Sequence, residues 1–230
     1  MQAVILAAGR GTRMKELTRS VPKPMLEVLG KSLIEHKLDA LPEEVSEVIL
    51  IIGYQGDAIR DAFGDEFGGR RVRYVVQETL DGTAGALWQA KDLLTDRFVV
   101  MMGDDLYAKE DVQACFESPD WSVLAEALPS MRAGGKIILD TEGSITAIEE
   151  GDHAGAPGLM NTNMLVLDPR VFQYPLVPKA PGSEEYGLPQ TVLQASRESG
   201  IPLRPVQASF WVQITAPEDL AEAARILGAR

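Results

Sequence analysis

The sequence predicts an α/β fold in which a mixed, mostly parallel sheet is flanked by helices on both faces. Three observations support this class. Short apolar runs recur through the first 102 residues, segments with helical spacing separate them, and 45% of the 230 residues are hydrophobic, enough for a substantial core. Strands of a parallel sheet are buried on both faces and therefore read as continuous apolar runs, and their alternation with helices is typical of βαβ units.

The front of the chain, about residues 1–110, carries this alternation most clearly. Buried strands are expected at 2–8, 47–54, 72–77 and 97–102. Apolar residues at positions 33, 34, 38 and 41 have helical spacing, and further helices are expected at 57–63 and from Ala84 to Leu94. A strand thus follows a helix three times, which indicates a sheet covered on both sides.

The back of the chain, about residues 111–230, has a different rhythm. Strand-like segments at 121–128, 136–140, 144–150 and 159–168 have few helices between them. Helices are expected from Pro189 to Ser199 and over 217–227, where Pro217 suits a first turn. The Pro- and Gly-rich stretches at 151–158 and 175–187 are expected to be loops over a site. Without a linker between the halves, the sequence predicts a single domain over residues 1–230.

Composition and charge exclude several classes of partner. The net charge is −12 and the pI is about 4.7, whereas a protein that binds nucleic acid or an anionic membrane is usually basic. The one cysteine, Cys115, allows no disulfide within the chain and fits a reducing compartment. No apolar run approaches the ~18 residues that span a membrane. We expect a cytoplasmic protein with no nucleic-acid or membrane partner, and a homo-oligomer is compatible with the sequence.

A glycine-rich basic loop follows the first strand, in "VILAAGRGTRM" (4–14). Ligands of open α/β sheets bind beyond the carboxyl ends of the strands, and glycines expose successive N–H groups that can hold anionic oxygen. Neither the Rossmann nor the Walker A spacing is present. Five basic residues lie within 10–23, namely Arg10, Arg13, Lys15, Arg19 and Lys23. This concentration of positive charge predicts a phosphate site.

The pattern "LAAGRGTRM" followed by "PKPM" resembles the sugar-phosphate nucleotidylyltransferases, also called nucleoside-diphosphate-sugar pyrophosphorylases. The resemblance continues at matching intervals over essentially the whole chain. It implies a single Rossmann-like domain with a nucleotide-binding front and a sugar-binding back, and nothing in the sequence predicts the C-terminal β-helix acyltransferase domain of some relatives. In the family reaction a sugar 1-phosphate oxygen attacks the α-phosphorus of an NTP and pyrophosphate leaves.

The resemblance also implies roles for individual residues. Arg13, Lys23 and Asp104 are the expected catalytic residues: Arg13 on the triphosphate, Lys23 near the α-phosphate and the sugar phosphate, and Asp104 on Mg²⁺, the expected cofactor. Gln77 and the Gly82 backbone would pair with the edge of a pyrimidine, because a carboxamide both donates and accepts. The full expected nucleotide site is Leu6, Ala8, Gly9, Gly11, Thr12, Arg13, Gln77, Gly82 and Thr83.

The back half is expected to bind the sugar through Gly135, Glu150 and Asn161. Three departures from the family pattern occur here. The lysine common after the family's glutamate is missing, because Gly151 follows Glu150, and Asn163 stands where a glycine is common. Gln213 occupies the place of a second metal-binding aspartate; an amide oxygen can coordinate Mg²⁺ but adds no negative charge.

The sequence therefore favours a transferase that moves a uridylyl or thymidylyl group from UTP or dTTP to a sugar 1-phosphate. Two alternatives stay open. One is a guanylyl- or cytidylyltransferase of the same fold. The other is a regulatory subunit that binds nucleotide sugars with weak or no turnover, for which Gln213 and the missing lysine are the support.

Overall fold

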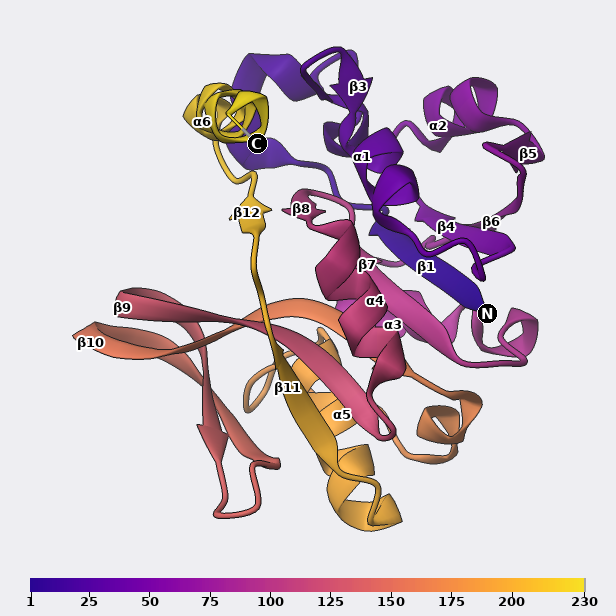
Figure 1. Ribbon diagram of the computed structural model, residues 1–230. Helices are drawn as coiled ribbons and strands as arrows, with labels where there is room; N and C mark the ends of the chain where they lie inside the picture. The colour runs from indigo at the N-terminus through magenta and orange to yellow at the C-terminus, as the bar shows by residue number, and fades with distance from the viewer. Residues whose placement is uncertain (230) are drawn as a thin grey trace.

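The computed structural model describes residues 1–229, and an eight-stranded sheet runs through its centre (Figure 1). The strand order is β11-β9-β10-β7-β1-β4-β6-β5. The strands β1 (Gln2–Ala7), β4 (Glu47–Ile52), β6 (Arg70–Val76) and β7 (Phe98–Met102) are mutually parallel, as are β9 (Trp121–Leu139) and β11 (Leu203–Gln207). Only β10 (Ile145–Leu167) and the short β5 (Glu66–Phe67) run antiparallel to their neighbours. The predicted mixed, mostly parallel sheet is confirmed.

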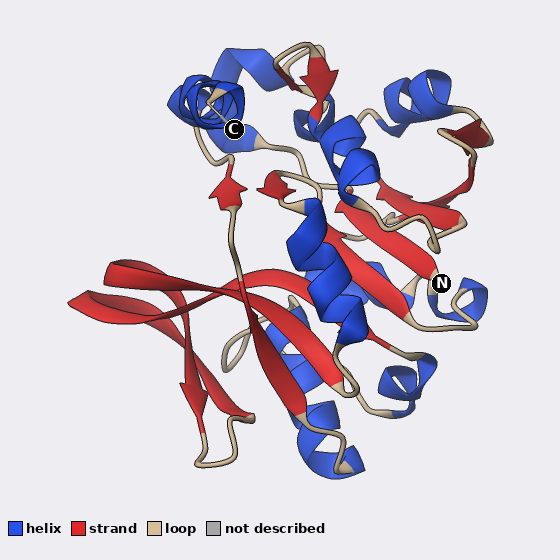
Figure 2. Ribbon diagram, in the orientation of Figure 1, coloured by secondary structure: helices blue, strands red, loops and turns tan. Residues whose placement is uncertain are grey.

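Helices cover both faces of this sheet (Figure 2). The helices α3 (Gly82–Trp88) and α5 (Leu188–Ser199) pack on one face, against alternate residues such as Val4 of β1. On the other face α1 (Leu33–Ala40), α2 (Gly56–Phe63) and α4 (Lys109–Glu117) pack against Ala3 and Ile5. The period of two along a strand sends successive side chains into the two cores, which explains why β1 and β4 are apolar throughout.

The expected helix from Ala84 to Leu94 is shorter in the structure. It ends at Trp88, and a separate 3-10 turn covers Lys91–Leu93. Three further 3-10 segments lie at Thr12–Thr18, Lys23–Met25 and Pro169–Gln173. Within the described residues, no helix is long and apolar enough to cross a membrane.

The back half is built from two long bent strands rather than four separate ones. β9 and β10 contain all four expected segments, and each strand bends back so that Leu159 pairs with both Ala127 and Ile137. The expectation of a loop over 151–158 is wrong, because these residues continue β10; Asp152 and Ala156 pair with Ala133 and Met131. Positive φ angles at Gly151 and Gly155 let the strand bend there, so the glycines mark irregular strand and not loop.

The C-terminal segment returns to the front half. β12 (Trp211–Gln213) pairs antiparallel with β8 (Asp105–Tyr107), and α6 (Pro217–Gly228) lies beside the small hairpin of β2 (Glu27–Val28) and β3 (Lys31–Ser32) (Figure 1). A third apolar cluster forms there and includes Val28, Leu106 and Ala223. The last strand therefore lies directly against the segment that follows β7.

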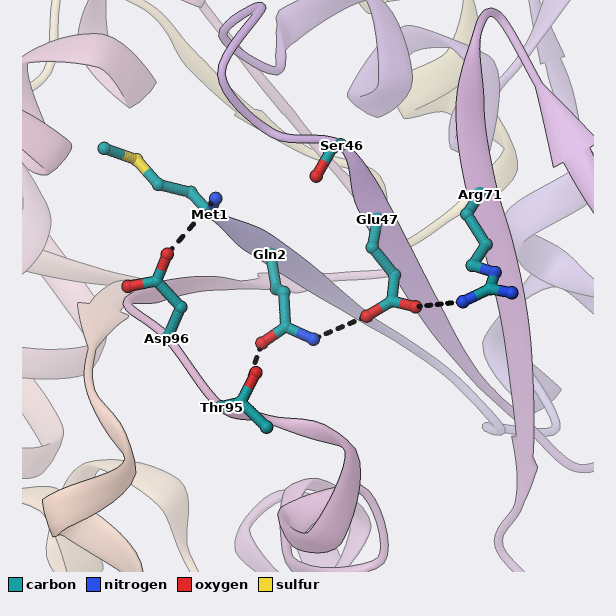
Figure 3. Close-up of a pocket in the computed structure, with 7 residues that line it drawn as sticks. All are labelled: Met1, Gln2, Ser46, Glu47, Arg71, Thr95 and Asp96. Atoms are coloured by element: carbon teal, nitrogen blue, oxygen red, sulfur yellow. Dashed lines mark hydrogen bonds and ion pairs between the residues drawn. The ribbon is translucent and has the colours of Figure 1, made fainter.

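A polar network occupies the amino ends of the parallel strands (Figure 3). The Gln2 amide donates to Glu47 at 2.6 Å and accepts from the Thr95 N–H at 2.9 Å. Glu47 also forms ion pairs with Arg73 at 2.7 Å and, more loosely, with Arg71 at 3.9 Å. These contacts join the starts of three strands. They lie at the amino ends of the parallel strands, opposite the carboxyl ends where the site described next is found.

Candidate active site

A cleft of about 890 Å³ opens at the carboxyl ends of β1, β6 and β7 and extends across the bent part of β9 and β10. This is where an open α/β sheet binds ligands. All the site residues expected from the sequence line this cleft: Leu6, Ala8, Gly9, Gly11, Thr12, Arg13, Lys23, Gln77, Gly82, Thr83, Asp104, Gly135, Glu150, Asn161 and Gln213. The fold thus brings the front and back sets together in one cavity.

The basic loop forms one lip of the cleft. Gly11 has a φ of 61°, and an added Cβ would lie 2.8 Å from the Cβ of Lys23, so only glycine allows the loop to pack there. Buried Met14 anchors the following turn. Arg10 and Arg13 are exposed, and within residues 1–229 neither forms an ion pair, whereas Arg19 is paired with Glu16 at 2.7 Å. The lip therefore carries positive charge that the protein leaves available to an anion.

Lys23 and Asp104 form an ion pair in the wall of the cleft. The Lys23 Nζ donates to Asp104 Oδ2 at 2.6 Å, and the lysine is only 7% exposed. Lys23 starts a 3-10 turn after Pro22, whose extended ψ of 144° sets the direction of the chain. Asp104 follows Gly103, whose N–H donates to Leu6 O at 2.9 Å. A short charge-assisted bond between two fixed elements places one cation and one anion at the floor of the site.

Two ionisable side chains near this pair, Asp105 and Lys37, are fully buried. Asp105 accepts hydrogen bonds from Trp211 Nε1 at 3.0 Å and Tyr107 OH at 3.3 Å, and within residues 1–229 its Oδ1 has no partner. Burial, and then the Asp104 charge, raises the Asp105 pKa to about 7. Lys37 is 1% exposed and donates to Leu33 O at 3.0 Å; burial lowers its pKa to about 8 against the attraction of both aspartates.

Gln77, Gly82 and Thr83, the residues expected to read the base, line the cleft in the front half. Gln77 is 6% exposed, and its Nε2 donates to Asp81 Oδ1 at 2.8 Å and to Gly82 O at 3.2 Å. Gly82 has a φ of 97°, and a Cβ there would lie 2.3 Å from Tyr186 O, so glycine is required. Thr83 lines the cleft, but its hydroxyl accepts from the Leu188 N–H at 3.0 Å and ties α3 to α5.

The three expected sugar residues lie together in the back half. Glu150 stands opposite Gly135 in the β9–β10 register, and a Cβ on Gly135 would lie 2.9 Å from Glu150 Oε1 and 3.5 Å from the Cβ of Asn161. Asn163 has a φ of 60°, which explains why glycine is common at this position; asparagine tolerates this conformation. The Asn163 N–H and Oδ1 bind the side chain of Asn161, at 2.9 Å each, and fix its orientation.

Asp104 and Gln213 both line the cleft, and each carries a side-chain oxygen that could bind a metal ion. Gln213 pairs with Asp105 in the β12–β8 register, and the Ile214 N–H donates to Asp104 O at 3.0 Å, so the two side chains start from adjacent backbone. Mg²⁺ takes oxygen ligands and keeps water and substrate phosphates in its shell, which this donor set fits. Among residues 1–229 no group of three or more His, Cys, Asp or Glu could hold a metal. Such an ion would need phosphate oxygens to complete its coordination.

Several residues to which no sequence motif assigns a role also line the cleft. Lys179, Glu185, Tyr186 and Gln190 come from the loop before α5 and from its first turn. Lys179 Nζ pairs with Glu185 Oε2 at 3.1 Å, and both side chains are more than half exposed. The expectation that 175–187 is a loop over the site is confirmed. The charged residues of this loop are the feature of the sequence that could have indicated its place in the cleft. Trp211 is half-buried; it packs against the core on the helix α1 face of the sheet and also lines the cleft.

Comparison with known proteins decides the family. The model of the family described as "Nucleotidyl transferase" matches residues 2–227 of this chain. The chain belongs to the nucleotidyl transferase family. The resemblance to sugar-phosphate nucleotidylyltransferases is therefore confirmed, as is the single-domain fold that it implies.

Individual relatives show the spread of activities within this nucleotidyl transferase family. The "UTP--glucose-1-phosphate uridylyltransferase AglF" of Haloferax volcanii is 29% identical over 97% of this chain and 95% of its own length. The "Bifunctional protein GlmU" of Methanocaldococcus jannaschii is also 29% identical, over 99% of this chain, which spans about half (54%) of that relative. A crystal structure of a putative glucose-1-phosphate thymidylyltransferase from Bacillus anthracis shares the fold, with a TM-score of 0.81 at 24% identity over 98% of this chain and 94% of its own.

The name of a third relative indicates transfer of a guanylyl group instead of a uridylyl or thymidylyl group. The "D-glycero-alpha-D-manno-heptose 1-phosphate guanylyltransferase" of Campylobacter jejuni is 28% identical over 75% of this chain and 78% of its own length. The family is therefore established, and the base that this chain selects has to be argued from its own residues.

Proposed function

We propose that this protein transfers a nucleotidyl group from an NTP, with UTP or dTTP favoured, to a sugar 1-phosphate. The observation that carries the proposal is the Lys23–Asp104 pair at 2.6 Å, which lines the same cleft as Gln77 and Gly82 and as the Gly135–Glu150–Asn161 group. A nucleotide in the front half and a sugar phosphate in the back half would then meet at this pair.

The reaction joins two anions, so the site has to cancel repulsion and hold the two reactants in line. Lys23, buried and held against Asp104, would contact the α-phosphate and the incoming phosphate oxygen. Arg13 on the exposed lip would stabilise the charge of the departing pyrophosphate. No covalent intermediate on the protein is required; positioning and charge stabilisation suffice.

A divalent cation at Asp104 and Gln213 would neutralise phosphate charge at the same place. Lys179 supplies a further cation in the cleft, and the family's lysine after Glu150 is missing from this chain. Lys179 is paired with Glu185 at 3.1 Å. An incoming phosphate would compete with Glu185 for this lysine.

A coupled assay for pyrophosphate release, across NTPs and sugar 1-phosphates with Mg²⁺, tests the proposal. Release that requires both substrates is the expected result. Asp104→Asn should lower kcat by ~10²-fold or more, because it removes a charge at the reacting phosphates. Asp39→Asn is the matched control, since Asp39 also pairs with a lysine at 2.6 Å but on the exposed surface of α1.

The regulatory alternative rests on Gln213, which adds no charge where the family commonly has aspartate. Tight binding of a nucleotide sugar without release from any pair of substrates would favour that alternative. Turnover gained by Gln213→Asp would then show that the missing carboxylate is the cause. An unchanged rate in Asp104→Asn would contradict the assigned role of Asp104.

A further inference from the structure

The side chain of Asp81 does not do what its position in the sequence suggests. It stands at the N-cap of α3, where an aspartate usually accepts from the first N–H groups of the helix, yet it makes no such bond. Its Oδ1 instead accepts from Gln77 Nε2 at 2.8 Å. The carboxylate is therefore committed to the residue expected to read the base.

This contact fixes which way the Gln77 amide points. The nitrogen has two hydrogens, and both have acceptors: Asp81 Oδ1 at 2.8 Å and Gly82 O at 3.2 Å. Turning the amide over would place its oxygen against a carboxylate and a carbonyl, so the orientation follows from charge. Within residues 1–229, Oε1 is the one polar side-chain atom of Gln77 without a hydrogen-bond partner, and Gln77 lines the cleft.

The surroundings hold Asp81 in this arrangement. Its carbonyl accepts from the Tyr186 N–H at 2.7 Å and its own N–H donates to Thr79 O at 2.9 Å. Gly85, one turn into α3, leaves space for the carboxylate: a Cβ there would lie 2.1 Å from Asp81 Oδ1. A larger residue at 85 would push the carboxylate away from Gln77.

We propose that Asp81 is a positioning residue for base selection, which holds Gln77 so that an amide oxygen, and not an amide nitrogen, meets the nucleobase. An oxygen acceptor suits a base whose ring presents an N–H on its pairing edge, as uracil, thymine and guanine do. Cytosine and adenine present a ring nitrogen with a lone pair there, and two acceptors repel. This inference rests on the proposed function in that it places the base at Gln77.

The test compares kcat/KM for UTP, dTTP, GTP, CTP and ATP in the wild type and three variants. Asp81→Asn keeps the shape of the side chain but can turn either its amide oxygen or its amide nitrogen toward Gln77. Gly85→Ala displaces the Asp81 carboxylate without changing any charge. Glu78→Gln is the matched control. Glu78 is exposed on the same segment, and this substitution removes one negative charge, as Asp81→Asn does. Thermal unfolding of each variant checks that it folds.

We expect the wild type to prefer its best N–H base over CTP by ~10²-fold or more, as sites built around a substrate hydrogen bond do. Both Asp81→Asn and Gly85→Ala should reduce this ratio by ~10-fold, mainly through KM, because each weakens one buried hydrogen bond. Glu78→Gln should keep the wild-type ratio. A loss of overall rate with an unchanged ratio would mean that Asp81 is merely structural and would overturn the proposal, as would a wild type that prefers CTP or ATP.

Calorimetric binding of UDP and CDP to the same proteins asks the same question without turnover. If no pair of substrates releases pyrophosphate but UDP is still preferred over CDP in an Asp81-dependent way, the proposed transferase fails and the inference stands. If turnover occurs and neither variant changes the base ratio in either measurement, the inference fails and the transferase stands.

Discussion

Replacing the buried carboxylate of Asp105 should make the protein relatively more stable as the pH rises. Burial raises the Asp105 pKa from 3.8 to about 7, so the folded protein holds a proton there that the unfolded chain has already lost. Below pH 3.8 the carboxyl is protonated in both the folded and the unfolded state, so it does not change the free energy of unfolding. Between pH 3.8 and about 7 only the unfolded chain loses the proton, so the free energy of unfolding falls as the pH rises. Asparagine at this position does not titrate, so the variant lacks this cost.

The size of the effect follows from the two pKa values. Between pH 5 and pH 7 the wild type should lose ~2 kcal/mol of unfolding free energy relative to Asp105→Asn, at 1.36 kcal/mol for each pKa unit. Asp105 is fully buried, so solvent screening does not reduce this figure appreciably. Lys37, whose pKa is about 8, stays mostly charged over this range in the wild type.

Urea unfolding of both proteins at pH 5 and pH 7, with a chelator present, measures this change. The two proteins share every other titrating group, and any pH-independent effect of the amide cancels when the difference at pH 5 is subtracted from the difference at pH 7. A difference that is the same at both pH values, or that moves in favour of the wild type at pH 7, would refute the claim that Asp105 is desolvated and protonated near neutrality.

Three smaller perturbations test other parts of the structure. Gly82→Ala, which drives a Cβ into Tyr186 O and strains a φ of 97°, should cost ~1–3 kcal/mol in thermal unfolding and weaken nucleotide binding by calorimetry; unchanged nucleotide affinity would contradict the close packing at the base. Ser32→Ala removes the acceptor of the Glu35 N–H in the capping box of α1 and should cost ~1 kcal/mol in urea unfolding, whereas no loss would show that the cap is dispensable. Cys115, whose pKa burial raises to about 12, should resist a thiol reagent at pH 8 until denaturant is added, and rapid labelling of the native protein would mean that α4 opens readily.

The front half of the fold was predictable because its signals are local. β1 and β4 are apolar runs that only a doubly covered sheet can bury, and the spacing of Leu33, Ile34 and Leu38 is one helical face. The basic loop and the segment around Gln77 follow strands directly, so a parallel sheet places both at the same edge. Once the strands were identified, this half of the cleft followed.

The back half was less predictable because its strands are irregular. Glycines at 151, 155 and 158 look like loop residues in the sequence, yet here they let β10 bend while it stays paired. Pairing between distant segments, such as Leu159 with both Ala127 and Ile137, leaves no local pattern. The same holds for the bond between Trp211 and Asp105, since nothing near either residue indicates the other.

Positions in the site were more predictable than contacts. Every expected site residue lines the cleft, but the sequence could not show that Asp81 is bonded to Gln77 instead of to the helix N-terminus. It also could not show that Lys23 and Asp104 are paired at 2.6 Å. Residue type fixes what a side chain can do, and only the assembled backbone decides which partner it reaches.

The pairing of β12 with β8 has a consequence for the newly made chain. Trp211 and Asp105 are 106 residues apart in sequence, and Gln213 reaches the cleft only through this pairing. When the front half of the chain has left the ribosome, Asp104 is therefore present but β12, the strand that pairs with the neighbouring β8, is not yet synthesised. Closing so long a loop is entropically costly and slow, so we expect this strand to dock late in folding. During synthesis the basic lip would form early, and the finished cleft would appear only after β12 has emerged.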